Sequence, residues 1–286
     1  MIKNFAGKLC VVTGGSSGIG LAIAEKLAAQ KARLLLVARD EAALQQAAAH
    51  LRQLGAAEVA TVSIDVASDE QMQRLAPAIA AMAPAADLVI NSAGIVSAGM
   101  VHEVPLEEWR RLHEVNVLGV VRVLGAVLPA MLARSARGEG GGQIVNIASA
   151  AGLVGFAGLG AYAGTKAAVV GFSESLRSEL SGAGIGVTTV CPGFVKTPIA
   201  SKLKLFGRMN TPRTERFMQE WFVRNNLEAE TVARKTIDAI RRNRALVVIG
   251  RDATSGYWTK RIAPRVLDKM MARMTRSMNR TRPAKA

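Results

Sequence analysis

The first thirty residues constrain the fold more than any other stretch of the chain. Leu9–Thr13 is a short β-branched run, a glycine-rich segment with the sequence GGSSGIG follows over 14–20, and an Ala- and Leu-rich segment continues to about Gln30. This order predicts a strand, a tight turn and a helix. Small residues let the backbone approach a pyrophosphate, and a helix N-terminus offers unpaired N–H groups and a partial positive charge. We therefore expect a dinucleotide site here, with a simple tight turn as the other interpretation.

Strand-forming runs alternate with helical segments through most of the chain. The alternation predicts a doubly wound, parallel α/β sheet of about seven strands flanked by helices, a Rossmann-type architecture, in one domain over residues 1–258. The expected helices after the first cover 41–54, 69–82, 106–133, the segment that follows Tyr162, and 228–242. The expected strands are Leu9–Thr13, Arg33–Ala38, Glu58–Ile64, Asp87–Asn91, Gln143–Ala148, Gly186–Cys191 and Ala245–Ile249.

Four polar residues could form an acid–base site. Tyr162 and Lys166 are four residues apart on an expected helix, so their side chains share one face. An ammonium near a phenol favours the phenolate, so we expect Lys166 to lower the pKa of Tyr162 from roughly 10 toward the range of a general acid. Ser149 follows a predicted strand, which would deliver its hydroxyl nearby. Asn116 lies inside a predicted helix, where asparagine is unfavourable; a polar role and a buried structural amide both explain it.

The end of the second predicted strand bears on the choice of cofactor. A carboxylate at this position would accept the ribose 2′-hydroxyl of NAD, whereas Ala38 and Arg39 leave room and positive charge for a 2′-phosphate. The sequence therefore favours NADP(H) over NAD(H). Asp40 is a counter-argument, because it could neutralise Arg39 or turn toward a ribose, and a solvated arginine is a further interpretation.

Taken together, the motifs resemble those of the short-chain dehydrogenase/reductase family in its single-domain form, over roughly residues 6–250. The resemblance implies NAD(P)-dependent oxidation or reduction of alcohols and carbonyls, usually in dimers or tetramers. Many NADP-preferring members carry a basic residue where this chain has Ser17, so the preference for NADP rests on Arg39. The motifs are Thr13-Gly14-x-x-x-Gly18-x-Gly20, Asp65-Val66, Asn91-x-Ala93-Gly94, Asn116, Ser149, Tyr162-x-x-x-Lys166 and Pro192-Gly193 with Thr197.

The resemblance also implies roles for these residues. Tyr162 would protonate the carbonyl oxygen, Lys166 would lower its pKa and bind the nicotinamide ribose, and Ser149 would hydrogen-bond the substrate oxygen. Asn116 would hold a water that links Lys166 to solvent. Besides Tyr162 and Lys166, the expected cofactor-binding residues are Gly14, Ser16, Ser17, Ile19, Arg39, Asp65, Val66, Asn91, Ala93, Gly94, Pro192, Gly193, Val195 and Thr197.

Residues 197–225 would cover the substrate in this family. Apolar residues alternate there with lysines and arginines, which suits an acyl or lipid-like carbonyl compound with an anionic head; a solvated basic lid is the other interpretation. The Thr13–Gly20 and Val37–Asp40 stretches, with the basic C-terminus, also show a loose similarity to the lipid-directed 3-ketosphinganine reductases. A protein that binds NADP(H) without turnover, or a membrane-associated regulatory protein, is the alternative to an enzyme.

The C-terminal 28 residues form a basic extension. Residues 259–286 contain nine Lys or Arg and one acid, a large part of the chain's net charge of +15. We expect an amphipathic helix that packs on the domain or on a second subunit, or lies on an anionic membrane through 262–280; a disordered tail is a further interpretation. Nucleic-acid binding is not expected, because aromatic interleaving and a binding motif are missing. The expected apolar face comprises Ile262, Val266, Leu267, Met270, Met271, Met274 and Met278.

Other features of the sequence point to the cytoplasm. No apolar run approaches the roughly 18–20 uncharged residues that span a bilayer, and the first strand leaves no room for a signal peptide. Cys10 and Cys191 lie in apolar runs, which predicts buried thiols in a reducing compartment. The three histidines lack metal-ligand spacing, so we assign no metal site. Peripheral contact with the inner membrane surface stays open because of the basic extension.

Overall fold

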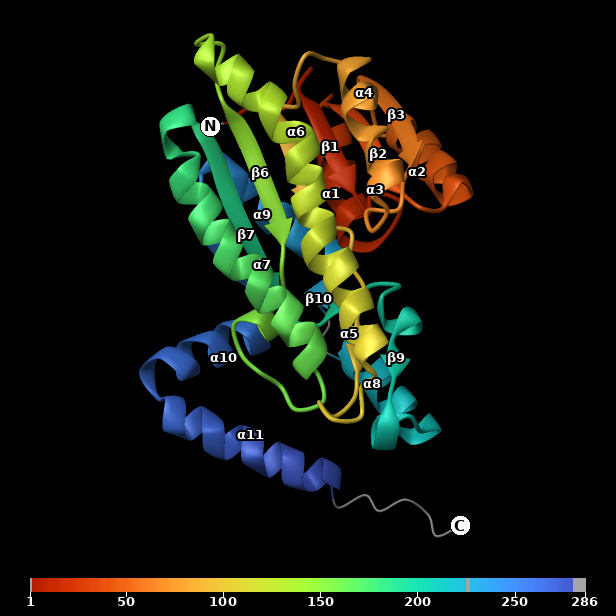
Figure 1. The fold of residues 1–286 in the computed structure, drawn as a ribbon, viewed down its shortest axis with the longest axis vertical. Helices are drawn as coiled ribbons and strands as arrows, with labels where there is room; N and C mark the ends of the chain where they lie inside the picture. Colours follow the sequence, from red (N-terminus) through yellow and green to blue (C-terminus); the bar gives the residue numbers. More distant parts are fainter. Residues whose placement is uncertain (1, 225–226, 280–286) are drawn as a thin grey trace.

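The computed structural model describes residues 2–224 and 227–279 of the chain, and its centre is a parallel sheet of seven strands in the order β11-β7-β6-β4-β1-β2-β3 (Figure 1). The predicted doubly wound α/β architecture is confirmed. The strands of this sheet are β1 (Leu9–Thr13), β2 (Arg33–Ala38), β3 (Glu58–Ser63), β4 (Leu88–Asn91), β6 (Gly142–Ile147), β7 (Ile185–Pro192) and β11 (Leu246–Ile249).

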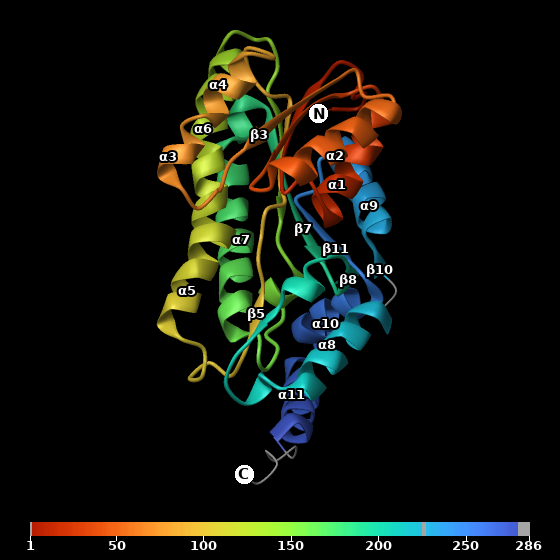
Figure 2. The same ribbon diagram turned by 90° about the vertical axis from the view of Figure 1, so that its right-hand side faces the viewer.

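Two layers of helices cover the sheet, as Figure 2 shows edge-on. The first, with Ile23, Leu44 and Ile240 among its buried residues, packs on Cys10 and Val12 of β1. Alternate strand residues point to opposite faces, so the other layer packs on their neighbours in the strand. The first layer is α1 (Gly18–Ala28), α2 (Glu41–Gln53) and α9 (Ala229–Arg241), and the second is α3 (Asp69–Met72), α4 (Leu75–Ala80), α6 (Gly119–Ala136) and α7 (Gly160–Glu179).

The chain order places the site at one edge of the sheet. The chain winds outward from β1 through β2 to β3 and then returns to β4 on the other side of β1. Thr13 at the end of β1 is in register with both Val37 and Asn91, so the carboxyl ends of the three strands lie together. Ligands of open α/β sheets bind at such a point of reversal, outside the carboxyl ends.

Two predicted helices differ from the structure. The segment 69–82 forms two short helices, α3 and α4, rather than one. The helix expected over 106–133 consists of α5 (Leu106–His113), a π-helical turn over Glu114–Leu118 and α6. π turns inside α-helices are frequent at functional sites. By length and composition Leu106–Ala136 could cross a membrane, yet Val123, Val127 and Met131 are buried against the sheet. We therefore interpret it as a core helix.

The lid segment, residues 197–225, contains regular structure. One small parallel pair connects it to the domain, β5 (Ser97–Ala98) with β9 (Lys204–Leu205), and a second pair, β8 (Val195–Lys196) with β10 (Leu227–Glu228), joins the two stretches that flank it. The lid also contains α8 (Pro212–Arg224). The expected C-terminal helix is preceded by another, so that α10 (Arg251–Ile262) and α11 (Pro264–Asn279) close the described chain. Because α10 begins before residue 259, the extension is continuous with the domain.

Candidate active site

The glycine-rich turn forms a cradle that only glycine can build. Gly14 and Gly18 have φ values of +65° and +57°, a region that side chains disfavour. A Cβ on Gly14 would lie 2.9 Å from the Ala93 nitrogen, and one on Gly20 would collide with the Gly14 carbonyl. The Ser17 side chain does not cap α1, so the first-turn N–H groups are left for a ligand. This geometry fits the pyrophosphate of a dinucleotide.

Asp40, which follows Arg39 at the end of β2, caps the next helix. Its carboxylate accepts the Ala43 N–H at 3.0 Å and so caps α2, rather than neutralising Arg39. The Arg39 side chain is 64% exposed, and its nearest anionic atom is the Asp65 Oδ2 at 3.9 Å. Such a loose, exposed pair holds a guanidinium weakly. Arg39 is therefore available to a phosphate at the end of β2.

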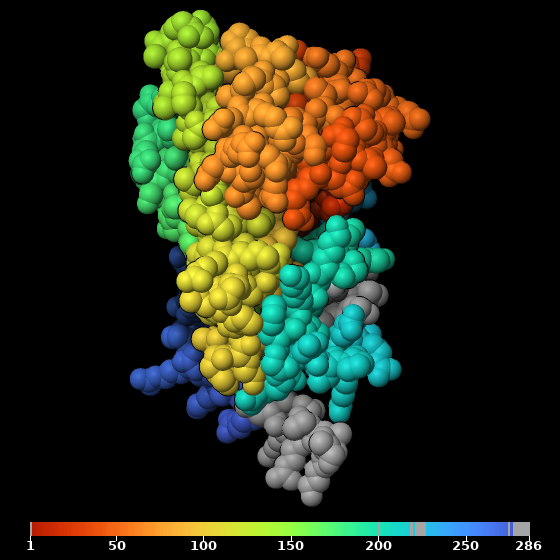
Figure 3. Space-filling view, turned by 45° about the vertical axis from the view of Figure 1, so that its right-hand side comes forward, coloured from red at the N-terminus to blue at the C-terminus, as the bar shows by residue number. Residues whose placement is uncertain are grey.

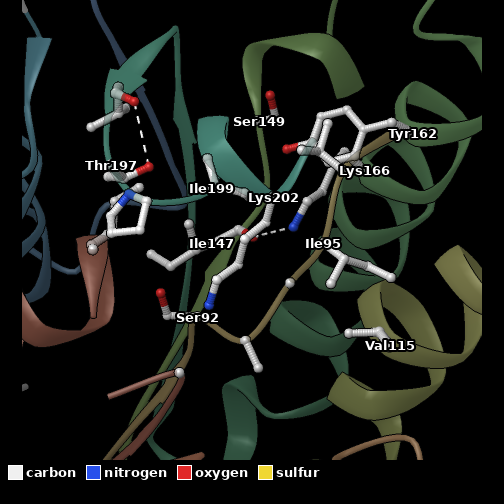
Figure 4. A pocket seen from close by; sticks show the side chains of 18 of the residues that line it. Ser92, Ile95, Val115, Ile147, Ser149, Tyr162, Lys166, Thr197, Ile199 and Lys202 are labelled. Carbon is white, nitrogen blue, oxygen red and sulfur yellow. Dashed lines mark hydrogen bonds between the residues drawn. The ribbon is translucent and has the colours of Figure 1, made fainter. Parts of the chain in front are cut away.

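The structure brings Ser149, Tyr162 and Lys166 together in one cleft with a volume of about 460 Å³ (Figure 4). Ser149 follows β6, and its hydroxyl accepts the Ala151 N–H at 3.1 Å. Tyr162 and Lys166 lie on the first turns of α7, with the ammonium nitrogen 5.9 Å from the centre of the phenol ring. The Ile147 carbonyl fixes that ammonium by accepting a hydrogen bond at 2.9 Å.

Burial governs the protonation of this pair. It raises the pKa of Tyr162 to about 12, against the opposing effect of a hydrogen bond with Ser149, and the nearby Cys191 thiol raises it further. Burial also lowers the pKa of Lys166 to about 8. The expectation that Lys166 lowers the Tyr162 pKa is therefore wrong for the protein without ligands. The loss of hydration destabilises the phenolate by more than the hydrogen bond with Ser149 stabilises it. Tyr162 is therefore a neutral phenol at physiological pH.

Asn116 lies in the π turn and is completely buried. Its amide oxygen accepts the Ile95 N–H at 2.9 Å, and its amide nitrogen donates to the Ile95 carbonyl at 2.9 Å and to the Thr165 hydroxyl at 3.1 Å. The side chain therefore joins the loop after β4 to α7, and it does not line the cleft. A structural amide is thus one of its functions, and the predicted water relay stays a prediction.

Nearly all the predicted cofactor-binding residues line the cleft, and Asn91 is the exception. Its side chain lies within the sheet and donates to the Asn146 amide oxygen at 2.8 Å. The neighbouring turn is held instead by the Thr13 hydroxyl, which accepts the N–H groups of Ser92 and Ala93 at 3.1 and 3.2 Å. The residues that do line it are Gly14, Ser16, Ser17, Ile19, Arg39, Asp65, Val66, Ala93, Gly94, Tyr162, Lys166, Pro192, Gly193, Val195 and Thr197.

The sequence did not predict that α10 forms part of the cleft wall. Asp252 and Ala253, in its first turn, both line the cleft. The Asp252 carboxylate accepts the Phe194 N–H at 3.4 Å and lies so close to Gly193 that a Cβ there would come within 2.5 Å of it. An aspartate at a helix start is common, so no pattern could have identified it.

The lid and the loop before α7 together supply apolar surface beside the cleft, and the lid adds positive charge at its rim. Phe156 and Leu203 pack with Leu159 and Met209 in an apolar cluster beside the cleft, and Lys202 extends into it from the lid (Figure 4). The Glu103 carboxylate fastens the lid to the domain by accepting the Arg208 side-chain N–H at 2.6 Å and its backbone N–H at 3.1 Å. Figure 3 shows the lid in teal against the yellow α5.

Comparison with known proteins agrees with this geometry. The family model for short chain dehydrogenases matches residues 8–206. The 3-oxoacyl-(acyl-carrier-protein) reductase FabG of Vibrio cholerae is 34% identical over 200 residues, which are 70% of this chain and 78% of that protein.

Two solved structures share the fold over most of their length. A short chain dehydrogenase/reductase from Burkholderia phymatum in complex with NAD is 31% identical, with a TM-score of 0.78 and coverage of 100% of this chain and 99% of that one. An actinorhodin polyketide ketoreductase with NADPH is 31% identical, with a TM-score of 0.75 and coverage of 85% and 96%. The chain belongs to the short-chain dehydrogenase/reductase family of nicotinamide-dependent oxidoreductases that act on alcohol and carbonyl groups.

Proposed function

We propose that this protein reduces a ketone with NADPH and that Tyr162 is the proton donor. The observation that carries the proposal is the neutral Tyr162 phenol, which lies with Ser149 and Lys166 in the same cleft as the nucleotide cradle. The nicotinamide, when bound, supplies a hydride. The protein must then supply one proton and hold the carbonyl, and these residues do both.

Each side chain has one task in the proposed reaction. The Ser149 hydroxyl donates a hydrogen bond to the carbonyl oxygen and orients it. The Tyr162 hydroxyl gives its proton to the same oxygen as negative charge develops there. Lys166, held by the Ile147 carbonyl, offsets the charge left on the phenolate and binds ribose hydroxyls. Asn116 positions the loop that carries Ile95 and, in this proposal, holds a water that links Lys166 to solvent. Lys166 passes a proton to the Tyr162 phenolate after each turnover and regains one from solvent through this water.

The cofactor preference depends on Arg39, and we expect its replacement by alanine to raise the KM for NADPH. A charged hydrogen bond contributes about 1.5–3 kcal/mol, so the increase should be roughly tenfold to hundredfold. The KM for NADH serves as the internal control, because its adenosine ribose has a hydroxyl where NADPH has the phosphate. Initial rates with both cofactors measure the effect. Equal changes in the two KM values would contradict the NADPH preference.

The lining of the cleft supports a substrate with an apolar body and an anionic group. Phe156, Leu159 and Leu203 supply apolar surface, while Lys202 and Lys204 supply positive charge at the rim of the same cleft. FabG and the actinorhodin ketoreductase are named as acting on ketoacyl and polyketide substrates. We propose an acyl or lipid-like ketone for this protein. The likeness to 3-ketosphinganine reductases is compatible with this class but too loose to narrow it.

A substrate panel tests the function directly. Purified protein is mixed with NADPH and with 3-oxoacyl thioesters of increasing chain length, β-keto esters or ketoses, and the loss of nicotinamide absorbance is followed. We expect kcat/KM to rise with chain length among the thioesters, since each buried methylene contributes about 0.8 kcal/mol. NADPH binding without turnover of any ketone would favour the silent binding protein instead.

Assembly and location complete the proposal. We propose a cytoplasmic homodimer or homotetramer that also contacts the inner membrane surface through residues 262–280. The support for assembly is the number of exposed large apolar side chains on the α5–α6 segment. Leu106, Leu118, Val121 and Leu132 are each at least 40% exposed, and a second subunit could cover them.

A further inference from the structure

The apolar face of the C-terminal extension is divided in two. Leu267 is buried and Met271 is half-buried, so this half of α11 is covered by the protein. The other half is not: Val266 and Met270 are 52% and 53% exposed, and Ile262 at the end of α10 is 77% exposed. The predicted face is therefore only partly used for packing. Met274 and Met278, predicted on the same face, have side chains outside the described part of the structure.

Trp258 is a further exposed apolar side chain, on α10. Its side chain is 52% exposed and packs edge-on against Tyr257, with ring centroids 5.3 Å apart. Tryptophan is enriched where membranes meet water, because its ring is apolar and its N–H is polar. We call Trp258, Ile262, Val266 and Met270 the C-terminal apolar row.

Positive charge follows this row on its solvent side. At roughly 100° per residue, Lys269, Arg276 and Arg265 lie about 60–100° around α11 from Val266, away from the buried Leu267. All three are exposed, as is Arg273, which lies close to the line of the row itself. Asp268 is the single acid between residues 259 and 279. An apolar row with a cationic border is the composition of helices that lie in the plane of an anionic bilayer.

The row lies at the substrate end of the molecule. α10 and α11 are at the end of the sheet where the strands finish and the lid covers the cleft (Figures 1 and 2). The first turn of α10 lines the cleft through Asp252 and Ala253, and the last turn of the same helix carries Trp258 and Ile262. A surface bound by the row would therefore lie near the opening used by the substrate.

We propose that the C-terminal apolar row and its cationic border bind an anionic phospholipid surface, so that the protein takes its ketone from the membrane. A second copy of the chain is the weaker candidate, because a two-fold contact would bring Arg265, Lys269 and Arg273 of both copies together. The proposal that the protein binds a membrane depends only on the α10–α11 surface. The membrane origin of the ketone rests on the proposed function.

Vesicle sedimentation tests the proposal. The full chain should bind vesicles of phosphatidylcholine with phosphatidylglycerol much more strongly than pure phosphatidylcholine vesicles, and added salt should weaken the binding. The double variant Val266→Glu/Met270→Glu should lower the partition coefficient at least about tenfold, because it removes two apolar side chains that the bilayer would bury and adds negative charge that anionic lipid repels. Leu54→Glu is the matched control: Leu54 is 40% exposed and follows α2, remote from this row.

Two further measurements keep the outcomes distinct. Thermal unfolding and reduction of ethyl acetoacetate in solution should be the same in the double variant as in the parent chain, so a loss of vesicle binding with activity retained supports the proposal. Equal binding of both proteins to anionic vesicles would overturn it. The proposal would also be overturned if the parent chain did not bind vesicles and the variant had a smaller mass than the parent in light scattering. That result would identify the row as a subunit contact. Vesicle binding without reduction of any ketone would support the membrane-binding surface and contradict the proposed function.

Discussion

Replacement of Tyr162 by phenylalanine is expected to lower kcat for ketone reduction by roughly 10²–10⁴-fold, the usual contribution of general acid–base catalysis. The variant removes the phenol proton, which stays on Tyr162 at neutral pH because the pKa of Tyr162 is raised to about 12. Ring packing is retained, and the nucleotide cradle around Gly14 is untouched. The KM for NADPH should therefore change little. Initial rates and NADPH fluorescence titration measure the two effects.

Ser149→Ala is a useful companion to that variant. It leaves the acid in place and removes the hydroxyl that orients the carbonyl, so it should lower kcat less than Tyr162→Phe does. Full activity of Tyr162→Phe on any ketone that the parent reduces would show that another group delivers the proton. Loss of NADPH binding in the same variant would instead show that the phenol belongs to the cofactor site.

The second large effect concerns Lys166 and pH. Its pKa is lowered to about 8 by burial, so its ammonium is present below that value and is lost as the pH rises. If the ammonium supports proton transfer, kcat/KM for reduction should fall above pH 8 by about tenfold per unit. Tyr162 does not titrate in this range, because its own pKa is about 12. The pH profile of initial rates between neutrality and moderately alkaline conditions measures the decline.

Two substitutions separate charge from position at this residue. Lys166→Met should reduce activity roughly a hundredfold or more at every pH, because no cation remains beside the phenol. Lys166→Arg keeps a charge that is not lost below about pH 12, so whatever activity it retains should lack the decline above pH 8. A parent profile that stays flat through pH 9, or the same decline in Lys166→Arg, would contradict the role given to the ammonium.

The features that could be predicted from the sequence are those encoded by residues close together in the chain. The strand ends, the glycine cradle at Gly14 and the pairing of Tyr162 with Lys166 each depend on residue types a few positions apart, and the structure brings them together at one edge of the sheet. The π turn at Glu114–Leu118 was not predicted, because the helical spacing of apolar residues continues through it and only Asn116 indicates a departure.

The remaining differences arise from tertiary structure. The sign of the Tyr162 pKa shift depends on how much water is excluded from the phenol, which spacing on a helix does not reveal. Asn91 has the expected position after β4, yet its amide faces Asn146 on the neighbouring strand instead of the cleft. Asp252 reaches Phe194 across a long separation in the chain. Contacts of that range carry no signature in a single sequence.

The contact of α10 with the cleft bears on how the specificity of such an enzyme can change. The cradle, the proton donor and its lysine are all encoded before β7, whereas Asp252 and Ala253 belong to the last part of the chain. A recombination event that exchanges only the C-terminal segment would therefore alter one wall of the cleft and leave the proton donor and its lysine intact. In chimeras of two family members joined after β11, the reaction would come from the N-terminal parent and part of the substrate specificity from the C-terminal parent.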